Sequence, residues 1–207
     1  ALQGDFARHQ ASLEALGAEV CRVRRPGDLE GLDALVIPGG ESTTMLTLIE
    51  AQGMRPELEA FVRRRPVLGT CAGVILLGRG ATHLPAPTLG VLDVEVERNA
   101  YGRQIDSFNA EIEAPVLDGR FPGVFIRAPR LGRIGPGVQV VAHRVQGPGT
   151  VQEPVGVRAG NIVGLCFHPE LTRDLRFHRW LLTEVAGLGA PASADPEIAA
   201  SARGEDA

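Results

Sequence analysis

The residue with the clearest chemical signature is Cys71, in the sequence Gly69-Thr70-Cys71-Ala72-Gly73. A strand predicted over 67–70 precedes it and a helix predicted over 72–77 follows, so the thiol lies in a G-x-nucleophile-x-G elbow. This turn is so tight that its flanking positions must lack a Cβ atom. The helix N-terminus favours a thiolate, and its free amides, notably that of Ala72, can donate to an oxyanion. The motif predicts a nucleophilic cysteine, with a small buried side chain at a tight turn as the alternative.

A second candidate is the pair His168 and Glu170, which follows an apolar strand predicted over 162–167. Pro169 disfavours helical geometry at His168, and in extended chain residues two apart point to the same face. We therefore expect the two side chains to project together, so that the carboxylate fixes the imidazole tautomer and stabilises the imidazolium. A surface ion pair that ends a strand is the alternative for this pair taken alone.

These candidates gain weight because each comes directly after a predicted strand. Pro38-Gly39-Gly40-Glu41 follows a third strand, predicted over 34–37, and a Gly-Gly peptide can aim an N–H group inward. In a parallel sheet, sites lie beyond the carboxyl ends of the strands. Nucleophile, base, base-orienting carboxylate and a second oxyanion donor can therefore converge at one edge, which predicts an acyl-transfer site.

The other cysteines and histidines carry weaker signals. Cys21 and Cys166 lie in apolar strand patterns and are expected in the core. Four histidines lack comparable partners and are expected to be ordinary surface or helix residues: His9, His83, His143 and His178. Without a CxxC or HExxH motif, no metal site is predicted. Three cysteines form a poor disulfide framework and suit a reducing cytoplasm, so we expect a cytoplasmic protein.

The elements that position these residues alternate between strands and helices in the first half. Strands are predicted over 19–23, 34–37, 67–70 and 162–167, and helices over 6–16, 42–50 (capped by Ser42), from Pro56, 72–77 and 175–185. Alternating acidic or turn-flanked patterns predict antiparallel strands over 92–97, 108–113, 138–145 and 151–157. The expected fold is α/β and flavodoxin-like, with a central, mostly parallel sheet covered by helices on both faces and added antiparallel strands.

Composition bounds the remaining possibilities. The 207 residues are 44% hydrophobic with a net charge of −4, which suits one domain, expected over 1–187, followed by a disordered tail over 188–207. No apolar run is long enough for a membrane helix, no leader indicates secretion, and no basic excess indicates nucleic acid. All 21 basic residues are arginine, which excludes Schiff-base and P-loop lysine chemistry.

Seven motifs in order give the chain a family resemblance. They are Pro38-Gly39-Gly40-Glu41-Ser42, Thr70-Cys71-Ala72-Gly73, Val96-Glu97-Arg98-Asn99, Tyr101-Gly102-Arg103-Gln104, Asp106-Ser107-Phe108, Val124-Phe125-Ile126-Arg127-Ala128-Pro129 and Phe167-His168-Pro169-Glu170. Together they resemble the glutaminase subunits of pyridoxal 5′-phosphate synthase, which are class I (triad) glutamine amidotransferases. The resemblance extends from Ala1 to about Val185. Ala1 to Gly4 correspond to the end of the family's first strand, so either the sequence is truncated or the sheet loses a strand.

The resemblance implies hydrolysis of L-glutamine to L-glutamate and ammonia, without a cofactor. The ammonia would pass to a (β/α)8-barrel synthase subunit that builds pyridoxal 5′-phosphate, the vitamin B6 cofactor. By position, Cys71 is the nucleophile, His168 the general base and acid, and Glu170 its orienting carboxylate. The implied glutamine contacts are Gly39, Gly40, Glu41, Arg98, Ile126 and Arg127, and the implied oxyanion donors are the amides of Gly40 and Ala72.

Three other readings compete with this one. A glutaminase of histidine biosynthesis would commonly show Cys-Leu-Gly-x-Gln at the elbow, whereas Cys71 here precedes Ala72-Gly73-Val74. A non-catalytic binding subunit is disfavoured by the intact set of Cys71, His168 and Glu170. A cysteine peptidase on the same type of sheet would cleave casein rather than glutamine.

Overall fold

The computed structural model describes residues 1–81, 83–98, 100, 107–147 and 152–189. Its α-helices are Phe6–Ala15 (α1), Ser42–Ala51 (α2), Arg55–Val62 (α3), Ala72–Leu77 (α4) and Arg176–Trp180 (α5). Its strands are Leu35–Ile37 (β1), Val67–Thr70 (β2), Val94–Glu97 (β3), Ser107–Ala114 (β4), Gly119–Ile126 (β5), Arg130–Ile134 (β6), Gln139–Arg144 (β7), Glu153–Ala159 (β8) and Ile162–Leu165 (β9). Three short 3₁₀ turns occupy Pro26–Leu29, Pro115–Leu117 and Pro169–Leu171, and a π-helical turn, Leu181–Val185, extends α5.

A seven-stranded sheet forms the centre of the described chain, in the order β1-β2-β9-β8-β7-β4-β5. β1, β2 and β9 run parallel, with Ile37 opposite Gly69 and Gly69 opposite Gly164. The four strands from β8 to β5 continue the sheet in antiparallel fashion, and β3 pairs with β6 in a separate ribbon. The α/β class with added antiparallel strands is confirmed, but the sheet is not mostly parallel as expected, because the added strands join the same sheet and outnumber the parallel pairs. Because β1, β2 and β9 are parallel, their carboxyl ends share one edge.

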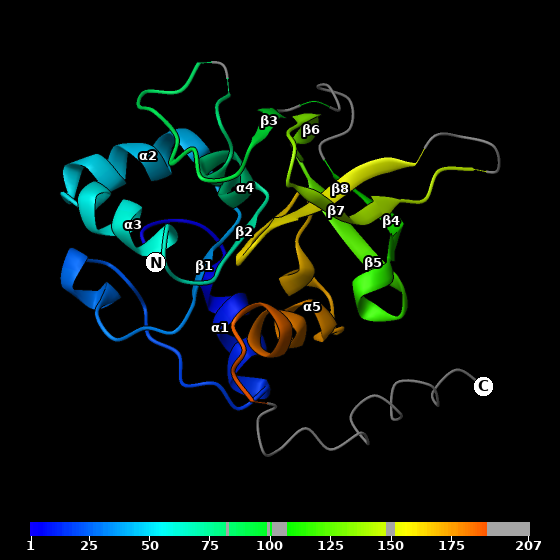
Figure 1. The fold of residues 1–207 in the computed structure, drawn as a ribbon, viewed down its shortest axis with the longest axis horizontal. Coiled ribbons are helices and arrows are strands. Elements are labelled where there is room, and N and C mark those ends of the chain that lie inside the picture. Colours follow the sequence, from blue (N-terminus) through cyan, green and yellow to red (C-terminus); the bar gives the residue numbers. More distant parts are fainter. Residues whose placement is uncertain (82, 99, 101–106, 148–151, 190–207) are drawn as a thin grey trace.

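Helices cover both faces of the parallel strands (Figure 1). On one face lie α2, α3 and α4, and on the other lie α1 and α5. Leu13 of α1 and Leu16 at its C-cap pack with Leu182 and with Val36 of β1, while α4 is buried along its whole length against the opposite face. Burial of these apolar faces accounts for the near-continuous apolar sequence of β2 and β9.

The first turn of α2 shows one difference from expectation. Ser42 was the predicted cap, but the helix begins at Ser42 and its N-cap is Glu41. The Glu41 carboxylate accepts hydrogen bonds from the amides of Thr43 at 3.1 Å and Thr44 at 2.7 Å. A carboxylate satisfies these two free N–H groups and also interacts favourably with the positive end of the helix dipole.

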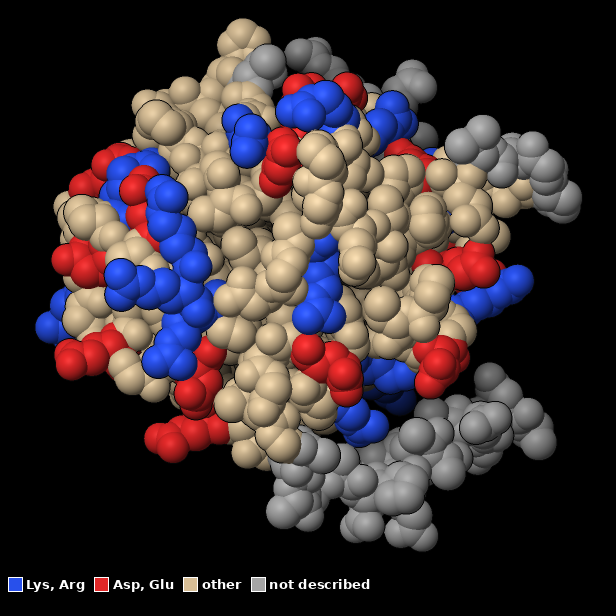
Figure 2. Space-filling model, viewed as in Figure 1, with Lys and Arg blue, Asp and Glu red and all other residues tan. Residues whose placement is uncertain are grey.

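Arginine and acidic side chains are interspersed over the face of the molecule viewed in Figure 2. This distribution matches the small net charge of −4. Within the described ranges no helix could cross a membrane, since even α1 and α2 have only ten residues each.

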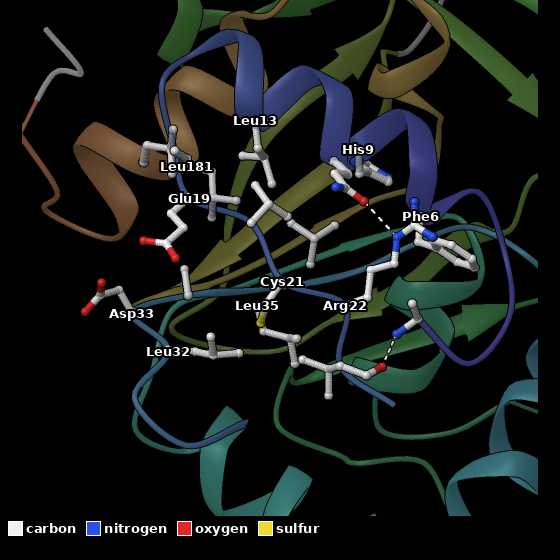
Figure 3. Close-up of a pocket in the computed structure, with 18 of the residues that line it drawn as sticks. Phe6, His9, Leu13, Glu19, Cys21, Arg22, Leu32, Asp33, Leu35 and Leu181 are labelled. Carbon is white, nitrogen blue, oxygen red and sulfur yellow. Dashed lines mark hydrogen bonds between the residues drawn. The ribbon is translucent and has the colours of Figure 1, made fainter. Parts of the chain in front are cut away.

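The predicted strand over 19–23 is wrong, and so is the expected burial of Cys21. This segment pairs with no strand in the described sheet, and Cys21 is exposed. Residues 18–23 line a groove of about 440 Å³ (Figure 3). The groove is also lined by residues 30–36, which lead into β1 and form its first part. Without ladder hydrogen bonds to a neighbouring strand, a short valine-containing segment remains irregular.

The second half of the chain keeps the predicted antiparallel character and adds strands. β3, β4, β7 and β8 fall within a few residues of the predicted ranges, whereas β5 and β6 were not predicted. β7 and β8 pair as the expected hairpin, although residues 148–151 of its turn lie outside the described residues. The predicted last helix is divided between α5 and the π-helical turn. Most of the tail expected over 188–207 also lies outside the described residues.

Candidate active site

Cys71 occupies a strained strand-to-helix turn. It joins β2 to α4 with φ of 48° and ψ of −104°, a backbone conformation that non-glycine residues rarely adopt. A Cβ atom at Gly69 would lie 2.7 Å from the backbone of Gly73, and one at Gly73 would lie 2.1 Å from the Ile37 carbonyl oxygen. The predicted requirement for glycine on both sides is therefore confirmed. The Cys71 amide donates to the Leu165 carbonyl at 2.8 Å, which ties the turn to the end of β9.

His168 and Glu170 lie together directly after β9. His168 Nδ1 is 2.7 Å from Glu170 Oε1, and both side chains are buried. The expected contact is present, but Glu170 belongs to the 3₁₀ turn Pro169–Leu171 rather than to extended chain. The difference arises because Pro169 has its φ fixed in the range that begins a helical turn. The His168 amide also donates to the Val124 carbonyl at 2.9 Å, so β5 holds the residue in place.

One cavity of about 410 Å³ brings together the residues predicted from different parts of the chain. Nine of them line it: Gly39, Gly40, Glu41, Cys71, Ala72, Arg98, Ile126, Arg127 and His168. Glu170 lies behind His168, away from the cavity lining. The convergence follows from the parallel register of β1, β2 and β9, which places Gly39, Cys71 and His168 at the same sheet edge.

The Gly39-Gly40 segment is packed against both the site and the N-terminal segment. A Cβ atom at Gly39 would lie 2.3 Å from His168 Cε1 and 3.2 Å from Cys71 Cβ. The Gly39 carbonyl accepts a hydrogen bond from the Asp5 amide at 3.1 Å. Gln3, which our sequence analysis did not place among the site residues, accepts from the Glu41 amide through Oε1 at 2.8 Å and also lines the cavity.

Arg98 and Glu41 form a charged rim on the cavity. Arg98 Nη2 lies 3.3 Å from Glu41 Oε1 and 3.2 Å from Thr43 Oγ1, while Nη1 donates to the His83 carbonyl at 3.1 Å. Burial alone would raise the pKa of Glu41, but hydrogen bonds from Thr44 and Thr43 lower it to about 2. Glu41 is therefore an ionised carboxylate. Its oxygens accept hydrogen bonds from the first turn of α2 and from Arg98.

Ile126 and Arg127 border the cavity opposite the elbow. The Cys71 thiol donates to the Ile126 carbonyl with an Sγ to oxygen distance of 3.7 Å. Arg127 follows with φ of 41°, again in the left-handed region, and its side chain is exposed. The strained backbone at Arg127 turns the chain directly after β5. The turn follows the Ile126 carbonyl, which faces the Cys71 sulfur.

The electrostatics of the His168–Glu170 pair favour opposite charges. Burial acts to lower the pKa of His168, but interactions with the Cys71 sulfur and with the hydrogen-bonded Glu170 carboxylate outweigh burial and raise it to about 10. Burial likewise acts to raise the pKa of Glu170, whereas hydrogen bonds from His168 and His9 lower it to about 2. At neutral pH the ring is an imidazolium beside a carboxylate. This state can donate a proton within the cavity.

Two histidines expected to be ordinary surface or helix residues do lie on helices α1 and α5, but they are buried behind this pair and have polar partners. His9 and His178 are buried, with 2% and 0% of their surface exposed. His9 Nε2 lies 3.2 Å from Glu170 Oε2 and 3.2 Å from Thr70 Oγ1. The expectation failed because long-range packing of α1 against α5 supplies the polar partners. The available sequence signal was the helical spacing of His9 with Ser12 and Leu13, at i, i+3 and i+4, which places them on one face of α1. In the structure that face is buried.

The other minor expectations have mixed outcomes. Cys166 is fully buried, as predicted, and burial raises its pKa well above the usual value. His83 is exposed and His143 is half-buried. In the described part of the chain, no group of three or more His, Cys, Asp or Glu side chains is arranged to hold a metal ion. The motif residues Asn99 and 101–106 lie outside the described residues.

The pKa shifts of the pair predict how stability depends on pH. His168 has a folded pKa of about 10 against 6.5, so its stabilising contribution is complete below pH 6.5 and is lost as pH rises towards 10. Glu170 has a folded pKa of about 2 against 4.5, so its contribution is present above pH 4.5 and is lost as pH falls towards 2. We expect the melting temperature to peak between these limits. Melts across this range should show a flatter alkaline side for His168→Asn, and an unchanged profile would contradict the charge assignment.

Comparison with known proteins agrees with this geometry. A model of the SNO glutamine amidotransferase family matches residues 1–187. The pyridoxal 5′-phosphate synthase subunit PdxT of Thermus thermophilus is 50% identical over 195 residues, which cover 91% of this chain and 96% of that relative. PdxT of Thermosipho africanus is 44% identical over 185 residues, which cover 89% of this chain and 95% of that relative.

A solved structure also matches at both the sequence and the fold level. It is described as a crystal structure of glutamine amidotransferase, and it superposes with a TM-score of 0.82 at 45% identity. The superposition covers 90% of this chain and 96% of the other. Family model, relatives and structure each match about nine-tenths of the chain, and the residues matched by the family model include every element that lines the cavity. This chain belongs to the SNO glutamine amidotransferase family.

Proposed function

We propose that this chain is the glutaminase subunit of pyridoxal 5′-phosphate synthase, and that it hydrolyses L-glutamine to L-glutamate and ammonia. Membership in the amidotransferase family and the printed names of its relatives support this function. The observation that carries the proposal is the strained elbow of Cys71, which borders the same cavity as the imidazole of His168. We assign the glutaminase domain to residues 1–187.

The first half of the reaction forms a thioester. The thiolate of Cys71 attacks the side-chain amide carbon of glutamine, and the carbonyl oxygen becomes an oxyanion. Backbone amides of Gly40 and Ala72, both at the cavity, are the proposed donors to this oxygen. The imidazolium of His168 then gives its proton to the departing nitrogen, which leaves as ammonia.

The second half hydrolyses the thioester. After protonating ammonia, His168 is a neutral imidazole and can accept a proton from water. The resulting hydroxide adds to the thioester carbon, the C–S bond breaks, and glutamate leaves with the thiolate regenerated. Glu170, 2.7 Å from Nδ1, keeps the ring oriented and stabilises each imidazolium state.

Glutamine is expected to lie between the Gly39-Gly40 segment and the Ile126-Arg127 segment. Both arginines that border the cavity, Arg98 and Arg127, can meet the α-carboxylate of a free amino acid. Arg98 is held by Glu41, Thr43 and the His83 carbonyl, whereas Arg127 is exposed. We therefore expect the side chain of Arg127 to move more than that of Arg98 when glutamine binds.

The ammonia is proposed to pass to a (β/α)8-barrel synthase subunit in a hetero-oligomer. The names of the PdxT relatives support a synthase assembly. Free ammonia would be lost by protonation and diffusion, so direct transfer suits a dedicated subunit. Three free cysteines support a reducing, cytoplasmic setting.

We predict that the isolated chain is a poor glutaminase and that the synthase subunit activates it. The Gly39-Gly40 peptide can rotate at little steric cost, and it is linked to the N-terminal segment through the Asp5 amide and the Gln3 side chain. Contact on that segment can therefore set the orientation of the Gly40 N–H group. A missing oxyanion donor costs about 10²–10³ in rate.

The test is steady-state ammonia release at saturating glutamine, with and without the cognate synthase subunit. We expect the rate to rise by about 10²-fold or more on addition of the synthase. Casein serves as a control substrate, because cleavage of casein would favour a peptidase. Equal rates with and without the synthase would show that the site is already assembled.

A further inference from the structure

A buried row of polar groups continues from Glu170 into the interior on the side away from the cavity. Glu170 Oε1 contacts His168, while Oε2 lies 3.2 Å from Nε2 of His9 on α1. His9 Nδ1 in turn lies 2.9 Å from Nε2 of His178 on α5. The side chains of His9 and Glu170 are 2% and 0% exposed, so water does not compete for these contacts. The mechanism proposed above uses neither His9 nor His178.

The partners in this row assign the protons on its two inner rings. Burial and the nearby His9 lower the pKa of His178 to about 3, so this ring is neutral and carries one N–H. His178 Nδ1 has no partner in the described part of the chain, and an unpaired buried N–H is costlier than an unpaired lone pair. The proton therefore sits on Nε2 and is donated to His9 Nδ1. With Nδ1 as acceptor, His9 carries its own proton on Nε2, facing Glu170 and Thr70.

We propose that His9 is a positioning residue of the triad, which holds the outer oxygen of the Glu170 carboxylate while His178 fixes the tautomer of His9. The proposal rests on the proposed glutaminase function. In the described chain Oε2 of Glu170 is buried without a hydrogen bond of full geometry, and the His9 ring nitrogen lies 3.2 Å from it. A carboxylate with one oxygen hydrogen-bonded and the other in contact with an N–H group is restricted to one orientation, and that orientation points Oε1 at His168 Nδ1. The shared contact of His9 Nε2 with Thr70, the residue before Cys71, links the same ring to the elbow.

Removing this donor is expected to affect turnover rather than substrate affinity. In His9→Leu, the buried Oε2 of Glu170 loses the ring nitrogen that lies 3.2 Å from it, so we expect kcat to fall by about 10- to 100-fold. His9 is absent from the lining of the glutamine cavity, so KM should change by less than about twofold. A general loss of folding would instead lower both the amount of active enzyme and the melting temperature. It would not produce a lower kcat in an enzyme that is otherwise fully folded.

Two amide variants provide a matched comparison at the same position. A glutamine side chain places its nitrogen near the position of His Nε2, whereas an asparagine side chain reaches only as far as His Nδ1. We therefore expect His9→Gln to recover kcat to within about fivefold of the parent, and His9→Asn to remain as impaired as His9→Leu. Because both variants bury one amide, a merely structural role for His9 would affect them alike. This comparison decides the question even if His9→Leu does not fold.

The experiment uses the complex with the cognate synthase subunit and measures ammonia release, KM and melting temperature. Proton NMR of the His168 Nδ1–H resonance adds a direct readout, since this signal should move upfield and broaden in His9→Asn but not in His9→Gln. His143→Asn and His143→Gln, at a half-buried position on β7, are the control pair and should behave alike. Equal kcat values for His9→Gln and His9→Asn, both folded, would overturn the positioning role. An inactive parent complex would instead refute the proposed function.

Discussion

Replacement of Cys71 by alanine is expected to abolish glutamine hydrolysis while the fold persists. The thioester cannot form without the sulfur, so the rate should fall by about 10⁴-fold or more, to the background level. The side chain lies at a turn bordering the cavity, and loss of one sulfur atom there removes little core packing. Ammonia release from the synthase complex and thermal melting measure the two effects separately.

Cys21 provides the matched control for this substitution. It is exposed and lines the groove beside β1 rather than the cavity, so Cys21→Ala should retain parental activity. Mass spectrometry after incubation with a glutamine-analogue electrophile should show modification of the parent and of Cys21→Ala but not of Cys71→Ala. Residual hydrolysis above background in Cys71→Ala would contradict the assignment of Cys71 as the nucleophile.

The second large effect separates the roles of His168 and Glu170. His168→Asn should eliminate turnover, because among the described residues that line the cavity no other imidazole can move the proton between sulfur, ammonia and water. Glu170→Gln should retain a measurable rate, about 10²- to 10⁴-fold below the parent, because an amide oxygen can still accept the Nδ1–H bond but does not stabilise the imidazolium. Single-turnover ammonia release gives both rates.

The pH profile adds a check on this order. With Glu170 neutralised, His168 loses one of the two partners that raise its pKa to about 10, so the imidazolium should titrate at lower pH in Glu170→Gln. A Glu170→Gln variant more impaired than His168→Asn would contradict the assigned roles. An unshifted pKa of His168 in Glu170→Gln would show that the carboxylate does not stabilise its charge.

Local sequence determined the elbow and the residue types of the site. The glycines around Cys71 are required by contacts within a few residues and with β1, and the strand-turn-helix pattern is encoded over 67–77. The parallel strands β1, β2 and β9 could be predicted because β2 and β9 are buried on both faces and β1 is at least half-buried, which leaves short apolar runs bounded by glycine or proline. Since parallel strands end at one edge, the convergence of Gly39, Cys71 and His168 followed from the pattern alone.

Pairing between distant segments decided what the local pattern could not. The segment 19–23 has the β-branched and apolar residues of a strand but pairs with no strand in the described sheet, so it stays irregular and Cys21 is exposed. β5 forms because it pairs with β4, and β6 forms because it pairs with β3. The stabilisation from this pairing cannot be recognised from the sequence of either strand alone.

The tertiary structure also decided which histidines belong to the site. His168 could be recognised beside Glu170, two residues away, whereas His9 and His178 are separated from each other by 169 positions. Only the packing of α1 against α5 brings them behind Glu170. The same holds for Glu41, whose carboxylate caps α2 and meets Arg98 from 57 positions away. Sequence by itself determined which groups could react, because their type and immediate neighbours are local properties. The fold decided which buried groups hold them in place, because those contacts join helices and strands from opposite ends of the chain.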